Sequence, residues 1–557
     1  MILQGTRVAL PPLPLVHKRF EAHARTTPEA VALRCAGQQM TYAQLDARAN
    51  QFAHYLAARG YGRGDKIGLC LDYSVDLVVA VLGTLKAGAA YVPLDPTYPP
   101  ARLRLLLGQI PGLALVVASP STAGLVEPTT AEVVAPERWR DLLDGLPVTS
   151  PEILVGGDDL CYAVFTSGST GTPKLAGVRH EGWFNLLNWL TLEYGLHHGS
   201  DNLVVSAFGF DLSQRSLLMP LFCGATQHLM ASRHFDIAMA YRMLSQHSIR
   251  TVHCASSTLY LLVDWETARR GTALAGLDYV LFGGEPLHFD RIADWAHADG
   301  NTCTLLHQYG VAECTDIASS YDLTGYRPAE HGAAPVGRPV HNTEIHILDE
   351  KSQPVGAGEY GEICLSGKGV GAGYLNPTGP ESERFTTAVL DGTPRRLYRT
   401  GDRGRVTPAG DLVVAGRMDA QVKVRGMRID PADIERALDS LDGIRQAAVV
   451  ARESASGDHE LIAFVVPAAQ DLAESEVRAR LLETLPRNMV PARFLNIREL
   501  PLSPHGKVDR SALAEESRIQ HAATGTAADS QDLDGAEEGC DDYRKGAGHL
   551  VPRTPAR

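Results

Sequence analysis

The stretch Cys161-Tyr-Ala-Val-Phe-Thr-Ser-Gly-Ser-Thr-Gly-Thr-Pro-Lys174 joins an apolar run to a loop rich in hydroxyl groups and glycine. Apolar residues that lead into such a loop are typical of a buried strand followed by a turn. Glycine allows a close approach of the backbone, and successive N–H groups can form a concave site for an anion. The loop is not a Walker P-loop, because Pro173 precedes Lys174 and no Gly-Lys-Ser/Thr occurs in it. Taken alone, the stretch is as compatible with a surface loop that binds nothing as with a phosphate-binding loop.

The size and composition of the chain indicate a large globular protein. With 557 residues it is too long for one ordinary core, so we expect two or more domains. A hydrophobic fraction of 44% and a charged fraction of 21% are typical of soluble globular proteins. The net charge of −13 argues against a general nucleic-acid-binding surface. We find neither a signal peptide nor an apolar stretch of membrane-spanning length, so we expect no membrane partner.

The nine cysteines are scattered along the chain. They form no Cys-x-x-Cys pair, and no group of Cys and His has the spacing of a zinc site. The odd number of cysteines and the missing signal peptide favour reduced thiols and a cytoplasmic location.

Two regions of different pattern indicate two domains. From about residue 15 to 415, helix-like segments alternate with short apolar runs, which predicts a large α/β body with substantially parallel sheet. The runs are Lys66–Leu71, Leu113–Ala118, Leu160–Thr166, Leu203–Ala207, Thr251–Cys254 and Tyr279–Phe282. After Asp419 the pattern is that of a small mixed domain of normal size. The fold class we expect is therefore a large N-terminal multi-sheet α/β body and a small α+β C-terminal domain, joined by a hinge.

The boundaries follow from these changes of pattern. We assign residues 1–418 to the large domain and residues 419–517 to the small, mobile one. Residues 518–557 lose periodicity and gain Ala, Gly, Asp and Glu, so we expect a disordered tail there.

A series of motifs follows the phosphate-type loop in a characteristic order. The chain as a whole resembles the adenylate-forming superfamily, and in particular the amino-acid-activating adenylation domains of nonribosomal peptide synthetases, over about residues 15 to 515. The segments that carry the resemblance are Thr41–Leu45, Leu85–Asp95, Cys161–Lys174 with His180 and Gly182, Phe208–Asp211, Gly283–Glu285, Tyr309–Glu313, Gly361–Gly367, Tyr398–Asp402, Gly416–Gly426, Leu485–Pro491 and His505–Arg510.

The resemblance implies ATP and Mg²⁺ as cofactors and gives each motif a role. Attack of a carboxylate on the α-phosphorus of ATP joins two anions, so catalysis must come from positioning and from positive charge at the phosphates. Glu313 would hold Mg²⁺, a cation that prefers oxygen ligands. Tyr309 would stack on adenine, Asp402 would bind the ribose hydroxyls and Arg417 would support the nucleotide. The other nucleotide-binding positions implied are Thr166, Ser167, Gly168, Ser169, Thr170, Gly171, Lys174, Gly284 and Glu285.

Three further positions are implied in catalysis: His180, Lys507 and Asp419. The family lysine that aligns with Lys507 bridges the substrate carboxylate and the α-phosphate, although a lysine beside glycine is more often solvated. Asp419 aligns with the interdomain hinge, where the alternative is an ordinary turn aspartate. The small domain would rotate there after adenylation, so that the phosphopantetheine thiol of a carrier protein can attack the adenylate.

Asp211 distinguishes amino acids from other carboxylic acids as substrates. In the amino-acid-activating branch this aspartate pairs with the α-ammonium group, and a buried carboxylate without a cation would be costly. The alternative is a helix N-cap. By alignment of the motifs, the pocket wall consists of Asp211, Leu212, Arg215, Cys254, Leu281, Gly283, Gln308, Asp316 and Ile317.

The polar members of this wall predict a polar α-amino acid, because unpaired hydrogen-bonding groups reject apolar analogues. Arg215 favours a carboxylate or amide side chain. If Arg215 points outward, Asp316 favours a basic or hydroxylated one. The two can also pair with each other and leave a smaller pocket.

Some positions depart from the family pattern or mimic another one. Leu175, Val311 and Ala312 replace a glycine, a proline and a threonine, and Asp430 stands where glutamate is common. The run Gly367–Ala372 fits the dinucleotide pattern but opens no helix, so we interpret it as turn glycines.

No condensation motif and no carrier attachment site is found, so we expect a free-standing domain that serves a separate peptidyl carrier protein, with a small MbtH-like protein as a possible further partner. The rival interpretations are an acyl- or aryl-CoA ligase and a catalytically silent relative.

Overall fold

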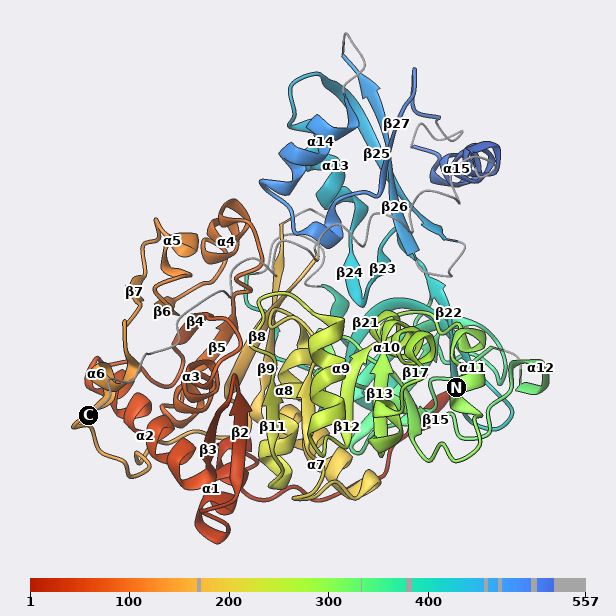
Figure 1. Cartoon of the computed structure of the whole chain (residues 1–557). Coiled ribbons are helices and arrows are strands. Elements are labelled where there is room, and N and C mark those ends of the chain that lie inside the picture. The colour runs from red at the N-terminus through yellow and green to blue at the C-terminus, as the bar shows by residue number, and fades with distance from the viewer. Residues whose placement is uncertain are drawn as a thin grey trace, which may run out of the picture.

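The computed structural model describes residues 1–167, 172–331, 333–376, 383–454, 459–468, 473–501 and 508–524. A large body built on three sheets carries a small domain on one side (Figure 1). The expected fold class, a multi-sheet α/β body with a small α+β C-terminal domain, is confirmed. Gly168, Ser169, Thr170, Gly171 and Lys507 lie outside the described residues.

A seven-stranded sheet contains the apolar part of the stretch Cys161–Lys174. Strand β8 (Leu160–Thr166) pairs with β9 (Lys174–Arg179) in an antiparallel hairpin and with β5 in parallel. The apolar run is therefore a buried strand, as expected, and the hydroxyl-rich loop connects the two strands. The other strands are β4 (Lys66–Cys70), β5 (Ala90–Pro93), β6 (Leu113–Ala118), β7 (Glu132–Val134) and β19 (Gly373–Tyr374).

Two helices of this region, α2 and α3, begin at residues whose side chains cap them. In the motif Thr41–Leu45, the Thr41 hydroxyl accepts a hydrogen bond from the Gln44 N–H while the Gln44 side chain accepts one from the Thr41 N–H, a capping box that starts α2 (Tyr42–Ala58). Ser74 caps α3 (Val75–Lys86) in a similar way. The remaining helices here are α4 (Pro100–Leu107), α5 (Ala123–Val126), α6 (Trp139–Leu143) and α7 (His180–Tyr194).

A nine-stranded sheet positions most of the predicted substrate pocket. Its central strands are parallel, and its two ends are closed by antiparallel strands. Neighbouring strands place Ala255, Gly283 and Gln308 side by side at one edge, the carboxyl ends of parallel strands, where ligands bind in open α/β sheets. The strands are β2 (Val31–Cys35), β3 (Gln38–Thr41), β10 (Asn202–Val204), β11 (Gln227–Leu229), β12 (Thr251–Ala255), β13 (Tyr279–Gly283), β14 (Thr304–Tyr309), β15 (Ser319–Asp322) and β16 (Arg338–Pro339).

The helices of this second part of the body include α8, which carries Asp211 and Arg215. The helices are α1 (Val16–Thr26), α8 (Asp211–Cys223), α9 (Ile237–Gln246), α10 (Ser256–Arg269), α11 (Ala293–Ala296) and α12 (Pro328–His331).

A six-stranded sheet completes the body, and every pairing within it is antiparallel. The expectation of substantially parallel sheet therefore applies to the other two sheets and not to this one. After Gly367 the chain passes to the short strand β19 and opens no helix, which confirms that Gly367–Ala372 is not a dinucleotide site. The strands are β1 (Ile2–Gln4), β17 (Thr343–Leu348), β18 (Gly361–Gly367), β20 (Phe385–Leu390), β21 (Thr393–Val406) and β22 (Leu412–Arg417).

The small domain consists of a hairpin, a three-stranded sheet and three helices. Helix α15 (Arg510–Thr524) continues past residue 518, where we expected the tail to begin, because its alanine- and glutamate-rich sequence favours helix. The other elements are β23 (Val422–Val424), β24 (Met427–Ile429), α13 (Pro431–Asp439), β25 (Ile444–Glu453), β26 (His459–Pro467), α14 (Glu474–Leu482) and β27 (Arg493–Asn496).

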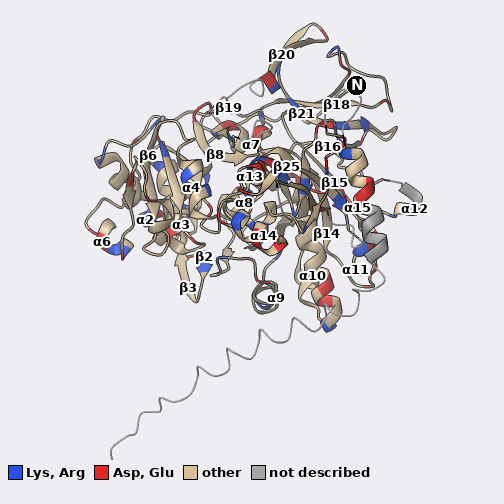
Figure 2. Cartoon of the chain, turned by 90° about the horizontal axis from the view of Figure 1, so that it is seen from above, with Lys and Arg blue, Asp and Glu red and all other residues tan. Residues whose placement is uncertain are grey.

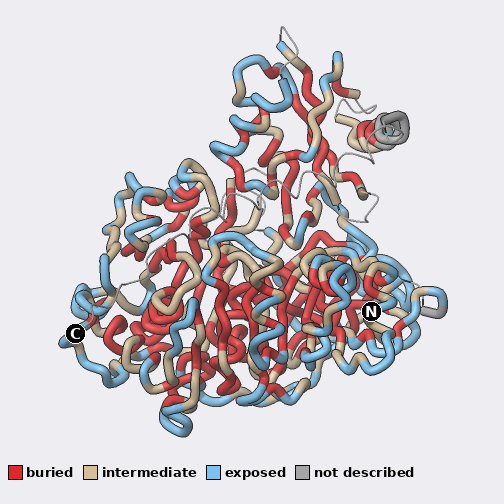
Figure 3. The backbone as a smooth tube through the Cα atoms, viewed as in Figure 1, coloured by how far each residue is buried: buried red, intermediate tan, exposed pale blue. Residues whose placement is uncertain are grey.

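Burial and charge follow the layers of the fold. Buried residues concentrate along the strands and the inner helix faces of both domains (Figure 3). Basic and acidic residues are interspersed along the chain (Figure 2). The eight described cysteines are free thiols. Within the described ranges, no helix combines the length and the apolar character that crossing a bilayer requires.

Candidate functional site

A cavity of about 690 Å³ lies between the large body and the β23–β24 hairpin of the small domain. The end of β8, the carboxyl ends of β12 to β14 and the start of α8 form its walls on the large body. The hairpin contributes Lys423, Arg425, Gly426, Met427 and Arg428. Residues from both domains thus enclose one space, with polar groups at both ends.

The described part of the phosphate-type loop borders this cavity. Thr166 and Ser167 line it, and the Ser167 hydroxyl donates a 2.9 Å hydrogen bond to the carbonyl of Arg428. The Thr166 hydroxyl is buried and has no hydrogen-bond partner in the described part of the chain. Lys174 starts β9 and is buried, with its Nζ 5.4 Å from the centre of the Tyr374 ring. The loop therefore meets the small domain directly, through Ser167.

Glu313 offers one free carboxylate oxygen to the cavity. Its Oε1 accepts a 2.6 Å hydrogen bond from the Tyr374 hydroxyl, whereas its Oε2 is buried and receives no hydrogen bond from any described residue. The nearby Arg428, with Nη1 at 3.6 Å from Oε1, lowers the pKa of Glu313 against the opposing effect of burial. An ionised carboxylate with an unused oxygen fits Mg²⁺. The described residues contain no cluster of three or more potential metal ligands, so other oxygens would have to come from the nucleotide and water.

The end of the cavity where we expected the nucleotide contains Tyr309. Its ring lines the cavity, its hydroxyl donates a 2.7 Å hydrogen bond to Asp402 Oδ2, and Lys423 Nζ lies 5.7 Å from the ring centre. Cross-strand pairing of β21 with β22 places Arg417 opposite Asp402, and Arg417 Nη1 donates to Asp402 Oδ1 at 2.6 Å. Both oxygens of Asp402 thus have donors and neither Asp402 nor Arg417 lines the cavity, so a ribose would have to compete for them.

Asp211 lies at the start of α8 with its carboxylate facing the cavity. It accepts a 2.8 Å hydrogen bond from the Leu212 N–H, and no ion pair is formed with any described residue. Burial and the neighbouring charge of Asp316 raise its pKa to about 7. The N-cap position belongs to Phe210, so the alternative that Asp211 caps the helix does not hold.

One turn further along α8, Arg215 pairs with two other predicted wall residues. Its Nε donates to Asp316 Oδ2 and its Nη1 to Gln308 Oε1, each at 2.6 Å. All three side chains line the cavity and are at most 8% exposed. Of the alternatives left open by the sequence, the structure has the internal Arg215–Asp316 pair.

The remaining wall positions divide into two groups. Leu212, Gly283 and Ile317 line the cavity together with the polar wall residues, and so does Gly284, which we expected at the nucleotide. Cys254 and Leu281 are fully buried and do not line it; they belong to core clusters behind the wall. For Cys254 the physical reason is strand alternation, because Ala255, one position along, faces the cavity. Leu281 lies two residues before the end of β13, whereas the cavity reaches only the last residue of that strand, Gly283.

Two positions expected at the nucleotide or in catalysis lie elsewhere. Glu285 Oε2 accepts a 3.0 Å hydrogen bond from the Ser257 N–H, so this carboxylate stabilises the start of α10 instead of lining the cavity. His180 starts α7 fully buried behind the β8–β9 hairpin, with its ring centre 5.8 Å from that of His17. Burial lowers the pKa of His180 to about 4, so its imidazole is neutral at neutral pH. His180 is also not among the residues that line the cavity.

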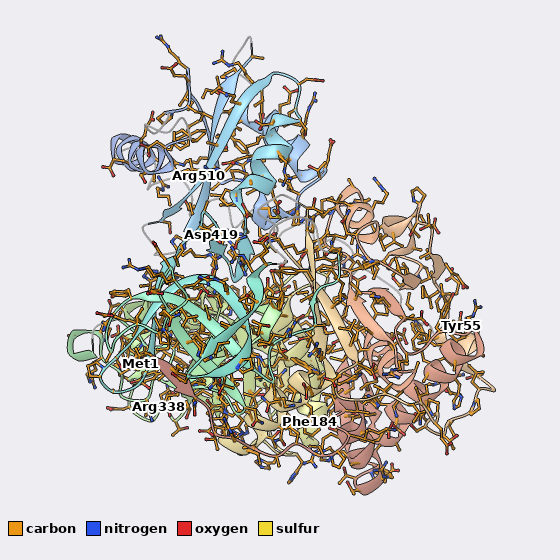
Figure 4. The ribbon with its side chains drawn as sticks, turned by 180° about the vertical axis from the view of Figure 1, so that it is seen from behind. Met1, Tyr55, Phe184, Arg338, Asp419 and Arg510 are labelled. Atoms are coloured by element: carbon orange, nitrogen blue, oxygen red, sulfur yellow. The ribbon has the colours of Figure 1, made fainter. Side chains whose placement is uncertain are left out.

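Asp419 lies at the junction of the two domains, below the small domain that carries Arg510 (Figure 4). Arg417 donates to both of its oxygens, at 2.7 and 2.6 Å, and Arg384 Nη2 donates to Oδ2 at 2.8 Å. These partners help to lower the pKa of Asp419 to about 2, against the opposing effect of burial.

Val508, next to Lys507 in sequence, packs against the apolar cluster of the small domain that contains Leu513.

Two cationic residues of the hairpin were not predicted from the sequence to lie at the site. Lys423 and Arg428 both line the cavity, and burial lowers the pKa of Lys423. They lie in or beside the quoted motif Gly416–Gly426, so the motif itself was the available signal. Only the approach of the small domain brings them to the large one.

Two family models match the chain. The AMP-binding enzyme model matches residues 20–375, and the AMP-binding enzyme C-terminal domain model matches residues 433–507. Among curated relatives, a linear gramicidin synthase polypeptide of Brevibacillus parabrevis is 36% identical over 528 residues, which is 94% of this chain. The chain spans only 6% of that relative's length.

Solved structures share the fold. An artificially fused adenylation–PCP di-domain nonribosomal peptide synthetase from Klebsiella oxytoca matches with a TM-score of 0.78 and 24% identity, over 87% of this chain and 94% of that one. A second such protein, containing adenylation and PCP domains and bound to a vinylsulfonamide inhibitor, matches with a TM-score of 0.77 and 27% identity, over 90% of this chain and 84% of that one. The chain therefore belongs to the AMP-binding enzyme family, as an adenylation domain of the nonribosomal peptide synthetase type.

Proposed function

We propose that this domain activates a polar α-amino acid with ATP and passes the aminoacyl group to the phosphopantetheine thiol of a carrier protein. The observation that carries the proposal is the Asp211 carboxylate, which faces the cavity without a cationic partner among the described residues. A carboxylate in such a place is costly unless a ligand brings a positive charge. The α-ammonium group of an amino acid supplies that charge, whereas a simple carboxylic acid does not.

The chemistry of the first step assigns roles to the two ends of the cavity. A substrate carboxylate oxygen attacks the α-phosphorus of ATP, the bond to the bridging oxygen breaks, and pyrophosphate leaves. Lys174, Thr166 and Ser167 would bind the phosphates, and Tyr309 would support the adenine. Bound Mg²⁺, held by Glu313, would neutralise phosphate charge. Lys507 would approach from the small domain, where positive charge favours the developing anion.

The second step needs a different position of the small domain. The carrier thiolate attacks the carbonyl carbon of the adenylate, the bond from that carbon to the phosphate oxygen breaks, and AMP leaves. The β23–β24 hairpin, which lines the cavity here, and Asp419 at the junction are suited to such a change, because hinges lie at domain boundaries. The relatives with adenylation and PCP domains support a carrier protein as the acceptor.

The test is ATP–pyrophosphate exchange across the proteinogenic amino acids with ornithine, citrulline and diaminopropionate, with an MbtH-like protein added in parallel. The matched variant is Asp211→Asn, which keeps the shape of the side chain and removes its charge. We expect exchange with a polar amino acid and a loss of roughly 10²-fold or more in the variant, on the scale for a buried charge left unpaired. Exchange with simple carboxylic acids but with no amino acid would refute the proposal and favour a CoA ligase.

A further inference from the structure

Arg215, Gln308 and Asp316 form a buried polar cluster at the end of the cavity beyond Asp211. We propose that this cluster binds a neutral, amide-type side chain of the substrate, either a carboxamide or a ureido group. The inference rests on the proposed function and narrows its substrate class. Some donors and acceptors of the cluster are already hydrogen-bonded within it, and those that are not indicate the groups that a ligand must bring.

The orientation of the Gln308 amide is determined by Arg215. A guanidinium group only donates hydrogen bonds, so the atom that it contacts must be the amide oxygen Oε1. The amide nitrogen Nε2 then points away from Arg215, and it is buried with no hydrogen-bond partner among the residues that the structure describes. A buried donor without an acceptor costs free energy, so this position calls for a ligand oxygen.

The acceptor side of the cluster is Asp316. Its Oδ2 receives the Arg215 Nε–H, whereas no described residue donates to Oδ1. An amide group meets both needs, because its oxygen accepts from Gln308 and its N–H donates to Asp316. A carboxylate side chain has no donor for Asp316, and an ammonium or guanidinium side chain has no acceptor for Gln308.

The charges of the cluster lead to the same conclusion. The positive charge of Arg215 and the negative charge of Asp316 cancel across a 2.6 Å contact that is nearly closed to water. A charged side chain would therefore enter a buried site that offers no net opposite charge, and its desolvation would go uncompensated. Of the other cations that line the cavity, Lys423 and Arg428 lie at the Tyr309 and Glu313 end, and Arg425 is on the same hairpin. Arg291 forms an ion pair with Asp264, and Arg102 interacts with the charge of Asp433.

Helix α8 sets the distance between the two ends of the substrate. Asp211 and Arg215 are four residues apart, so they lie on one face of the helix with an axial offset of roughly 6 Å. An amino acid whose ammonium group pairs with Asp211 can therefore extend its side chain along α8 to the cluster. This favours a side chain of at least glutamine length.

The backbone holds the cluster in place. Asp316 has φ of +67°, and a Cβ added to Gly310 would come within 1.7 Å of the Asp316 carbonyl oxygen. A Cβ added to Gly283 would come within 2.1 Å of the Gln308 carbonyl oxygen. The two glycines allow the strands and the loop to approach each other closely, which fixes the positions of Gln308 and Asp316. The positive φ of Asp316 is held by this close packing, and strained backbone of this sort is concentrated at functional sites.

The first experiment compares exchange rates within pairs of nearly equal shape: glutamine with glutamate, asparagine with aspartate, and citrulline with arginine. We expect the neutral member of the glutamine pair or of the citrulline pair to exceed its charged partner by at least about 10²-fold in kcat/KM, and both members of the shorter asparagine pair to be poorer substrates. Preference for a charged member, or for an apolar or hydroxylated amino acid over all three neutral ones, overturns the inference but leaves the proposed function intact. Silence with every amino acid rejects both.

The second experiment changes the charge of the cluster in both directions. Asp316→Asn, in which asparagine tolerates the positive φ, leaves Arg215 uncompensated and should raise the glutamate-to-glutamine ratio at least tenfold. Gln308→Glu removes the free donor and adds a negative charge, so it should raise the arginine-to-citrulline ratio to a similar extent. The matched control is Asp322→Asn on the exposed end of β15, outside the cavity. Ratios in both variants that equal those of the control overturn the inference.

Discussion

The pKa of Asp211, raised to about 7 by burial and by Asp316, predicts how activity depends on pH. Only the ionised carboxylate can pair with an α-ammonium group. Its ionised fraction is about one in eleven at pH 6 and about ten in eleven at pH 8, so kcat/KM for the amino acid should rise roughly tenfold between these pH values. The assay is pyrophosphate exchange at saturating ATP and Mg²⁺, with the amino acid varied at each pH.

The same carboxyl group also affects stability without any substrate. A carboxyl whose folded-state pKa lies above its ordinary value of 3.8 costs nothing below that value, and its cost grows as the pH rises toward 7. A rise of about 3 pH units at about 1.4 kcal/mol each gives a cost of about 4 kcal/mol above pH 7. Asp211→Asn should therefore raise the thermal unfolding midpoint, and more at pH 8 than at pH 5.

Two results would refute this reasoning. The first is a wild-type kcat/KM that stays flat between pH 6 and 8, since the raised pKa requires a change there. The second is a residual activity of Asp211→Asn that keeps the wild-type rise, because the titrating group would then be a different one. The unfolding midpoints provide the independent check, and an equal midpoint change at pH 5 and pH 8 would remove Asp211 as the source.

The other predictions concern groups at the remaining walls of the cavity and on the small domain. Replacing Lys507 by alanine should lower the exchange rate on the order of 10²–10³-fold, the scale for one preorganised charge contact, while the far-UV spectrum stays unchanged. Glu313→Gln should lower exchange on the order of 10²-fold and shift the Mg²⁺ titration to higher concentration, since Oε2 is its free oxygen; an unshifted titration would contradict the metal assignment. Arg428→Ala, which removes the 3.6 Å contact with Glu313 across the domains, should lower pyrophosphate exchange by about tenfold, because the buried Glu313 carboxylate loses its cation; an unchanged exchange rate would contradict a role of this contact in the first step. Gly283→Ala places a Cβ 2.1 Å from the Gln308 carbonyl oxygen, so it should cost about 1–3 kcal/mol of stability and weaken amino acid binding, read as a lower unfolding midpoint and a higher KM.

Much of the architecture could be predicted from the sequence, because its signals are local. The apolar runs at Leu113–Ala118 and Leu160–Thr166 coincide with β6 and β8. Helix α13 begins at Pro431, and the side chain of Asp430 caps its first turn. Hydrophobic periodicity and caps act over a few residues, so a single sequence records them directly. The motifs were likewise sufficient for the family.

The positions of side chains relative to the cavity could be predicted only in part. Adjacent motifs placed Asp211 and Gln308 on the wall, but Cys254 and Leu281 lie one layer behind it. The local sequence pattern of a strand predicts neither which of its two faces borders a cavity nor where along the strand the cavity ends. Both depend on the elements that pack against the strand on each side.

The sequence by itself thus determined the family, the two domains and the kinds of residue available at the site. Only the tertiary structure decided how those residues combine. Arg215 and Asp316 are 101 positions apart, and their pairing, which turns two charged residues into a neutral cluster, depends on α8 docking beside the end of β14. Arg428 meets Glu313 only because a second domain closes over the first. Contacts between distant segments depend on the packing of whole elements, and local patterns carry no record of that packing.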